Sequence, residues 1–178
     1  MAELNHFSLT DPGEAPPSLR LLVSASDSLL RESIAAACRA RADTLVTACR
    51  DGFDALAEIV ANGPDIALVA ACMRNLSALQ LVRLVRAAGC PTKVIVISDE
   101  HSEVAIGMYL RRGMDGYLLD NQPTHQIHSA LEYVADGGCY IPPVFRRSRI
   151  ELELDRADVR PARTVATPAR KRRARVRR

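Results

Sequence analysis

The chain has 178 residues, of which 48% are hydrophobic and 4% aromatic, and it contains no tryptophan. This composition predicts one domain of about 120 residues with an aliphatic core. The net charge of +3 is unevenly distributed, because residues 146–178 carry 13 basic and 4 acidic side chains, while residues 1–145 carry 11 basic and 17 acidic ones. Neither a secretory signal nor an apolar run long enough to cross a membrane is present, so we expect a cytoplasmic protein.

The chain begins with a segment rich in proline and glycine, residues 1–17, which we predict to be a disordered leader. Short apolar runs then alternate with segments of helical period. The first half of the alternation predicts a strand at 19–23, a helix at 29–40 capped by Asp27 or Ser28, a strand at 44–48 and a helix at 52–61. In this second helix Phe53, Leu56 and Ile59 recur at helical spacing.

The second half of the alternation begins with the run 66–70, which is apolar at every position and therefore predicts a central strand covered on both faces. Leu81, Leu84, Val85 and Ala88 predict the buried side of the next helix. The predicted elements of this half are strands at 66–70, 93–97 and 116–119, and helices at 76–88, 104–112 and 123–135.

Five strand–helix repeats in about 120 residues predict an α/β fold with a five-stranded parallel sheet and helices on both faces. The flavodoxin-like, doubly wound strand order fits best. We therefore expect one domain over residues 18–145, followed by a basic tail over residues 146–178. In such sheets the working site lies at the carboxyl ends of the strands, so the loops after Val23, Ala70 and Ile97 are expected to line it.

Several segments resemble receiver domains of response regulators, in particular those that carry a LuxR-type helix-turn-helix output domain. The resemblance covers about residues 19–145 and implies the receiver fold. It also implies that the output domain is missing, since only about 33 residues follow Phe145. The segments that carry it are 29–33 (LLRES), 51–56 (DGFDAL), 64–66 (PDI), 94–98 (VIVIS), 113–119 (GMDGYLL) and 137–142 (GGCYIP).

The resemblance implies a phosphoryl-transfer site made of an acidic pair that binds Mg²⁺, an aspartate nucleophile and a lysine. In this sequence the acidic pair falls on Ala25 and Ser26, the phosphoacceptor on Ala70 and the lysine on Asp120. A methyl group cannot attack phosphorus, and Asp120 reverses the charge of the lysine. Arg74 replaces the usual proline. We therefore interpret the chain as a degenerate pseudo-receiver with no catalytic residues, no cofactor and no metal site, and not as an enzyme.

Two positions do match the family's switch residues, Ser98 and Tyr117. They could still support two states selected by a partner, or they could simply end a strand and pack on the fourth helix. The resemblance also implies that a regulatory protein or a second copy binds the face made by the fourth helix, fifth strand and fifth helix. Residues expected near this face are Ile106, Met108–Leu110, Tyr117, Ile127 and Leu131.

Three carboxylates near the expected site, Asp27, Asp99 and Asp120, are candidates for a divalent-cation site or a displaced phosphoacceptor, but capping and loop solvation are the favoured explanation. Asp65 begins its strand and is expected at the wrong end of the sheet. Histidines 101, 125 and 128 are expected to be solvated surface residues. The five scattered cysteines form no CxxC pair and are expected to be reduced thiols: Cys38, Cys49, Cys72, Cys90 and Cys139.

The end of the basic tail is dense in positive charge and contains no acidic or aromatic side chain between residues 169 and 178. Such a segment binds phosphate backbones without reading base sequence, and its affinity falls with salt. An anionic membrane surface, an acidic protein and the acidic body of the same chain are alternative partners, and the tail could also have no role. The predicted nucleic-acid-binding residues are Arg170, Lys171, Arg172, Arg173, Arg175, Arg177 and Arg178.

Three hypotheses for function remain open on the sequence. The first is a phosphorylation-independent signalling module in transcription regulation, which binds a partner protein and docks on DNA through its tail. The second is a phosphorelay receiver that uses a displaced carboxylate. The third is a sequence-independent nucleic-acid-binding protein that is dimerised by the receiver body.

Overall fold

The computed structural model describes residues 19–41 and 43–145. The predicted leader, the basic tail and the proposed domain boundary at residue 18 lie outside the described residues. All ten predicted elements are present, with ends that differ by at most two residues from those expected: β1 (Leu19–Ser24), α1 (Ser28–Arg39), β2 (Thr44–Cys49), α2 (Gly52–Asn62), β3 (Ile66–Ala70), α3 (Ala78–Ala87), β4 (Lys93–Ser98), α4 (Glu103–Leu110), β5 (Gly116–Leu119) and α5 (Thr124–Ala135).

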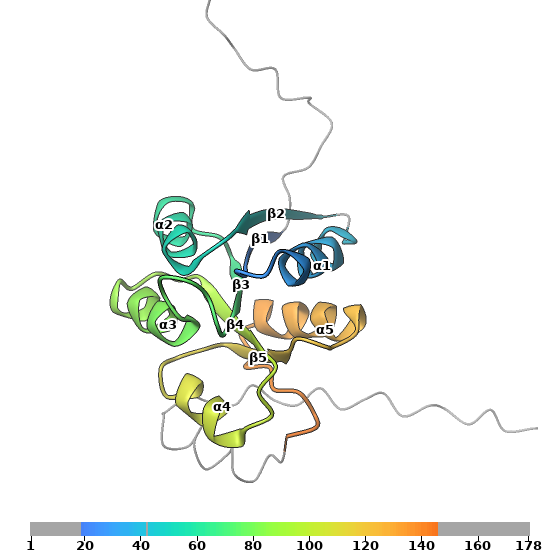
Figure 1. Cartoon of the computed structure of the whole chain (residues 1–178). Coiled ribbons are helices and arrows are strands. Elements are labelled where there is room, and N and C mark those ends of the chain that lie inside the picture. The colour runs from blue at the N-terminus through green and yellow to red at the C-terminus, as the bar shows by residue number, and fades with distance from the viewer. Residues whose placement is uncertain (1–18, 42, 146–178) are drawn as a thin grey trace, which may run out of the picture.

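The strands form one parallel sheet in the order β2-β1-β3-β4-β5, which confirms the doubly wound α/β prediction. Helices α1 and α5 cover one face of the sheet, and α2, α3 and α4 cover the other (Figure 1). Strand β3 is buried at all five positions, as expected for a central strand. None of the helices between residues 19 and 145 is long and apolar enough to cross a membrane.

Side-chain caps begin several helices where the sequence supplies short polar residues. Asp27, one of the two predicted caps of α1, accepts a hydrogen bond from the Leu30 amide at 2.8 Å. Ser77 and Gln80 form a reciprocal capping box at the start of α3, which explains why the helix begins at Ala78. These local bonds satisfy amides that have no partner inside the helix.

The predicted buried side of α3 is partly wrong, because Leu84 is 37% exposed and Ala88 is also exposed. In α2, Ile59 is buried, whereas Phe53 at the same helical spacing is 58% exposed. Helical spacing correctly finds Ile59 and Leu81, but the apolar stripe on each helix is wider than the strip that the sheet covers. The fully buried positions of α3 are Ala78, Leu81, Val82 and Val85.

The chain continues beyond α5 and packs back onto β5. Tyr140 accepts a hydrogen bond from the Tyr117 amide at 2.8 Å and donates one to the Asp115 carbonyl at 3.0 Å. Phe145 is then buried, with its ring centroid 6.0 Å from that of Tyr117 and 6.4 Å from that of His101. The last described residues are therefore anchored on the side of the sheet that α4 covers.

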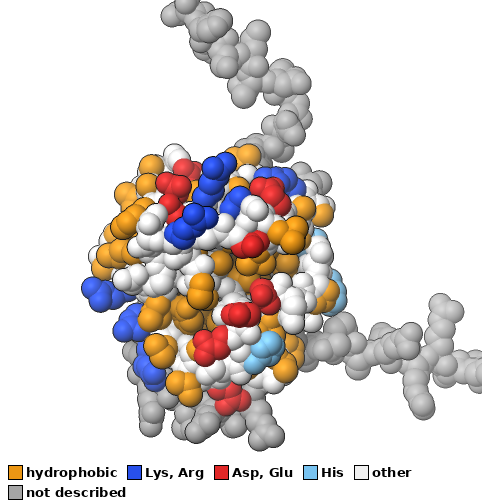
Figure 2. Space-filling view, in the orientation of Figure 1, with side chains coloured by type: hydrophobic (Ala, Val, Ile, Leu, Met, Phe, Trp, Pro, Cys, Tyr) orange, Lys and Arg blue, Asp and Glu red, His pale blue; other side chains and the backbone are white. Residues whose placement is uncertain are grey.

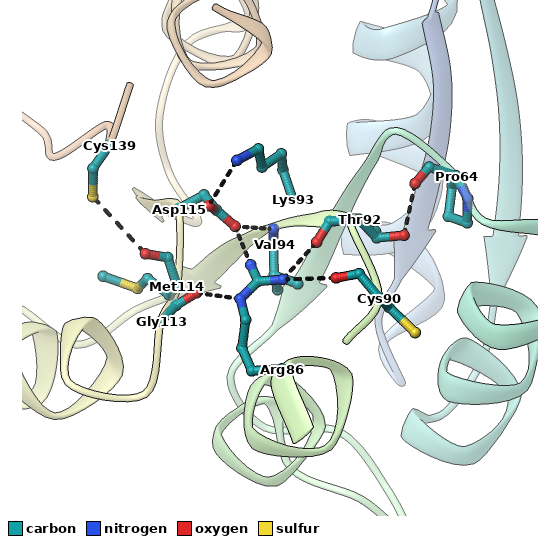
Figure 3. Close-up of polar contacts among 10 residues, drawn as sticks. All are labelled: Pro64, Arg86, Cys90, Thr92, Lys93, Val94, Gly113, Met114, Asp115 and Cys139. Carbon is teal, nitrogen blue, oxygen red and sulfur yellow. Dashed lines mark hydrogen bonds and ion pairs between the residues drawn. The ribbon is translucent and has the colours of Figure 1, made fainter. Parts of the chain in front are cut away.

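An ion-pair network ties α3 to the beginning of β4 and β5 (Figure 3). The Arg86 guanidinium pairs with the Asp115 carboxylate and donates to the carbonyls of Gly113 at 2.8 Å and Thr92 at 2.8 Å. Asp115 also accepts from the Val94 amide at 2.7 Å and lies 3.7 Å from the Lys93 ammonium. This network lies at the amino ends of the strands, so its role is structural.

Substitution Asp115→Ala is expected to lower the free energy of unfolding by about 2–3 kcal/mol. It removes the partner of a half-buried guanidinium and leaves the Val94 amide without its acceptor, and both losses are costly. Chemical denaturation measures the effect. Glu132→Ala is the control, since it breaks only an ion pair to Arg41 whose carboxylate side is 65% exposed and should cost about 0.5 kcal/mol. Equal losses in the two variants would contradict this assignment.

Candidate functional site

The candidate site is the carboxyl edge of the sheet, where β1, β3, β4 and β5 end. Strand register brings Ser24 beside Val69, Ala70 beside Ile97, and Ser98 beside Leu119. Ala25 and Ala70 are 1% and 6% exposed, and their methyl groups carry no atom that can ligate a metal or attack phosphorus. Three of the predicted site positions, Ala25, Ala70 and Ser98, are thus buried at neighbouring strand ends.

Ala25 and Ser26, which stand where the family has its acidic pair, are held in place by hydrogen bonds to other groups of the protein. The Ala25 carbonyl accepts a 2.7 Å hydrogen bond from the buried guanidinium of Arg31, and the Ala25 amide donates to the Cys49 carbonyl at 3.4 Å. The Ser26 hydroxyl accepts a 2.8 Å hydrogen bond from the Arg74 amide. Proline has no amide hydrogen, so this last bond requires a residue other than proline at position 74.

A second set of contacts joins the β1 end to the loops after β2 and β3. The Ser24 hydroxyl donates to the Asp51 carbonyl at 3.1 Å and lies 3.2 Å from the Met73 sulfur. The Asp51 carboxylate caps α2 and accepts a 2.8 Å hydrogen bond from the Asn75 amide group. Backbone hydrogen bonding, first from Asp54, lowers the pKa of Asp51. Direct protein contacts therefore connect three loops of this edge.

The sequence did not single out Ser24, Asp51 or Met73 as members of this set. Only the capping role of Asp51 had a local signal, since an aspartate stands directly before Gly52 at the start of a helical pattern. The other contacts join residues that are distant in sequence, and no spacing rule predicts them.

The two switch positions both contact the loop that follows β4. Ser98 accepts a hydrogen bond from the Glu100 amide at 3.1 Å, and the Tyr117 hydroxyl donates to the Glu100 carbonyl at 2.9 Å. Burial raises the pKa of Tyr117, and a hydrogen bond with Ser98 opposes that shift. Tyr117 is completely buried, with its ring 6.2 Å from that of Tyr109 on α4. The structure therefore brings Ser98 and Tyr117, the two predicted switch residues, together at Glu100.

The candidate displaced carboxylates are spread along the edge and do not form a cluster. Asp27 is used as the cap of α1, while Asp99 and Asp120 are exposed after β4 and β5. Asp65 lies at the opposite end of the sheet, as expected, where it accepts from the Arg20 amide at 2.7 Å. Within residues 19–41 and 43–145, no group of three or more histidine, cysteine or acidic side chains is placed to hold a metal ion.

The histidines and cysteines lie apart from one another in different environments. His101 and His125 are exposed, whereas His128 is half-buried and lies 2.8 Å from the Ala37 carbonyl, so it is not a solvated surface residue. All five thiols are free. Burial raises the pKa of Cys38 and Cys49 to about 11 and that of Cys139 to about 12, which makes these three thiols weak nucleophiles.

This arrangement of five parallel strands, with a candidate site at the carboxyl edge of the sheet, is found in a known protein family. The model of the response regulator receiver domain matches residues 22–132, which is more than half of the chain. The chain belongs to the response regulator receiver family. The seven predicted nucleic-acid-binding residues of the tail, Arg170 to Arg178, fall outside both that match and the described residues.

The proteins that this chain is similar to include transcriptional regulators. The probable transcriptional regulatory protein NarL of Mycobacterium tuberculosis is 29% identical over 129 residues, which cover 72% of this chain and 60% of NarL. The transcriptional regulatory protein LnrK of Bacillus subtilis is 23% identical over 126 residues, which cover 70% of this chain and 57% of LnrK. The chain thus spans about 60% of the length of these curated relatives.

Solved structures support the same fold. The receiver domain of NarL from M. tuberculosis superposes with a TM-score of 0.66 at 29% identity, covering 68% of this chain and 99% of that domain. A LuxR-family response regulator from Aurantimonas sp. SI85-9A1 gives a TM-score of 0.67 at 16% identity, covering 80% of this chain and 99% of its own. The family match confirms the resemblance to receiver domains that the sequence shows.

Proposed function

We propose that this receiver is a pseudo-receiver that regulates transcription in the cytoplasm without being phosphorylated. It acts by binding a partner protein or a second copy through the face made by α4, β5 and α5, and its basic tail contacts DNA. The observation that carries the proposal is the bond between Ser26 and Arg74. Two departures from the family pattern, a serine at an acidic-pair position and an arginine in place of proline, meet in one hydrogen bond.

That bond supports an edge of the sheet that has gained new contacts between protein groups, and has not only lost its reactive groups. In a working receiver, Mg²⁺ links the loop after β1 to the phosphoacceptor at the end of β3. Here the same two regions are linked by the Ser26 hydroxyl and the Arg74 amide, and Ser24 adds a contact to Met73. Both links are made by protein groups alone.

The environment of the switch residues supports the same proposal. Ser98 and Tyr117 have their hydroxyl groups bonded at Glu100, and the Tyr117 ring packs against Phe145 and Tyr109. These hydrogen bonds tie the loop after β4 to β4 and β5 through protein groups alone. A partner that binds the neighbouring face then meets a surface that is already formed, which lowers the conformational cost of binding.

A thermal-shift titration with Mg²⁺ and a small phosphoryl analogue such as beryllium fluoride tests this proposal. We expect the melting temperature of the native chain to stay unchanged, because a ligand stabilises a protein only if it binds the folded state. The control restores the family's residues in one variant, with Ala25→Asp, Ser26→Asp, Ala70→Asp and Asp120→Lys. A rise in the melting temperature of the native chain at millimolar Mg²⁺ would contradict the proposal.

A further inference from the structure

Helix α4 has an exposed apolar face that nothing among the described residues covers. Ile106, Gly107 and Leu110 point into the core, whereas Val104 is 64% exposed and Met108 is 41% exposed. Residues four apart lie on the same side of a helix, so Val104 and Met108 form one continuous strip. Such a strip offers an apolar contact to another segment or molecule.

The position of Phe145 brings one particular segment close to this strip. Phe145 is buried in the same apolar cluster as Ile106 and Leu110, and its ring lies 6.4 Å from that of His101, two residues before α4 begins. Five residues of extended chain reach about 17 Å, while eight helical residues span about 12 Å. The apolar residues Ile150, Leu152 and Leu154 can therefore reach α4.

The order of charges along α4 is complementary to the order of charges in the segment that follows Phe145. Asp99 and Glu100 are exposed and Glu103 is half-buried near the beginning of α4, and Arg111 and Arg112 are exposed at its end. Figure 2 shows acidic side chains in the central and lower part of the view, basic side chains along the left margin, and both kinds at the top. The segment that follows Phe145 has the complementary order, with three arginines at 146–149 and then Glu151 and Glu153.

We propose that residues 146–154 of the same chain dock along α4, from its beginning towards its end. The three arginines lie near the acidic residues before α4, and Glu151 and Glu153 lie near Arg111 and Arg112. Ile150, Leu152 and Leu154 alternate with the two glutamates, so in an extended segment they share one side, which covers Val104 and Met108. The docked segment occupies part of the face assigned to a partner and therefore competes with it.

Hydrogen exchange of the α4 amides in the full-length chain tests this inference. Leu152→Asp places a charge in the apolar contact and is expected to speed exchange in α4 about tenfold, with exchange in α2 unchanged. Val60→Asp is the matched control, because Val60 is 62% exposed on α2. It should leave exchange in α4 as it is, and unchanged circular dichroism shows that the variants remain folded.

Reversing the charges on the two sides of the proposed contact gives a second, independent test. Glu151→Arg with Glu153→Arg is expected to speed α4 exchange, and adding Arg111→Glu with Arg112→Glu is expected to restore it. Native α4 exchange in Leu152→Asp would overturn the inference. So would protection of α4 that falls on dilution, because a second copy would then be the occupant. Neither outcome bears on phosphorylation, so the inference and the proposed function can fail separately.

Discussion

Substitution Gly52→Ala is expected to lower the free energy of unfolding by about 3 kcal/mol, one of the largest effects of a single methyl group in this protein. A Cβ atom at position 52 would overlap the carbonyl oxygen of Leu76 and stand 2.6 Å from its Cβ atom. The Gly52 amide also donates to the Arg74 carbonyl at 3.2 Å, so the backbone of α2 directly contacts the loop after β3. Overpacking against backbone forces that loop to move.

Chemical denaturation of Gly52→Ala measures this effect, and Gly63→Ala is its control. Gly63 ends the same helix at φ +53° with nothing within 4 Å of an added Cβ, so it should cost only the about 1 kcal/mol of a left-handed backbone. A loss in Gly52→Ala no larger than that in Gly63→Ala would show that the loop after β3 yields easily. The carboxyl edge would then be less rigid than its contacts indicate.

Neutralising the seven basic residues between 170 and 178 to glutamine is expected to weaken binding to a generic DNA duplex at least about 100-fold at low salt. Each arginine or lysine that contacts a phosphate releases counterions, so the native chain should lose affinity with a log–log salt slope of up to about −6. Fluorescence anisotropy over a salt series measures both quantities.

The matched control for the tail neutralises Arg39, Arg50 and Arg83, three exposed arginines on the body. It should change the affinity by less than about threefold, since the body carries net negative charge. Undiminished DNA retention after neutralisation of the tail would show that the tail is not the binding element. Absence of binding by the native chain at low salt would direct attention to a protein partner.

The fold could be predicted from the sequence because its signals are local. Continuous apolar runs such as 66–70 and caps such as Asp27 depend on neighbouring residues and survive in the structure. The helix faces were less predictable, since Phe53 and Leu84 fit the helical period but lie beyond the area that the sheet covers. Periodicity shows which side of a helix is apolar, but it does not show how much of that side the sheet covers.

In the candidate site, too, some features could be predicted from the sequence and others could not. The absence of reactive groups at Ala25 and Ala70 could be read from aligned motifs. The hydrogen bonds that join the loops of this edge could not, because they join residues 27 to 49 positions apart, from Ser24 to Asp51 and Met73 and from Ser26 to Arg74. The burial of Phe145 against Tyr117 was also unpredictable, since a single aromatic after two prolines has no periodicity.

Intact-mass measurement after incubation with a small-molecule phosphodonor and Mg²⁺ tests phosphorylation independence most directly. We expect the native chain to keep its mass, and the variant with Ala25→Asp, Ser26→Asp, Ala70→Asp and Asp120→Lys serves as the comparison because it regains the nucleophile and the cation ligands. A native chain that gains the mass of one phosphoryl group, mapped to Asp27, Asp99 or Asp120, would contradict the account and identify a working receiver with a displaced acceptor.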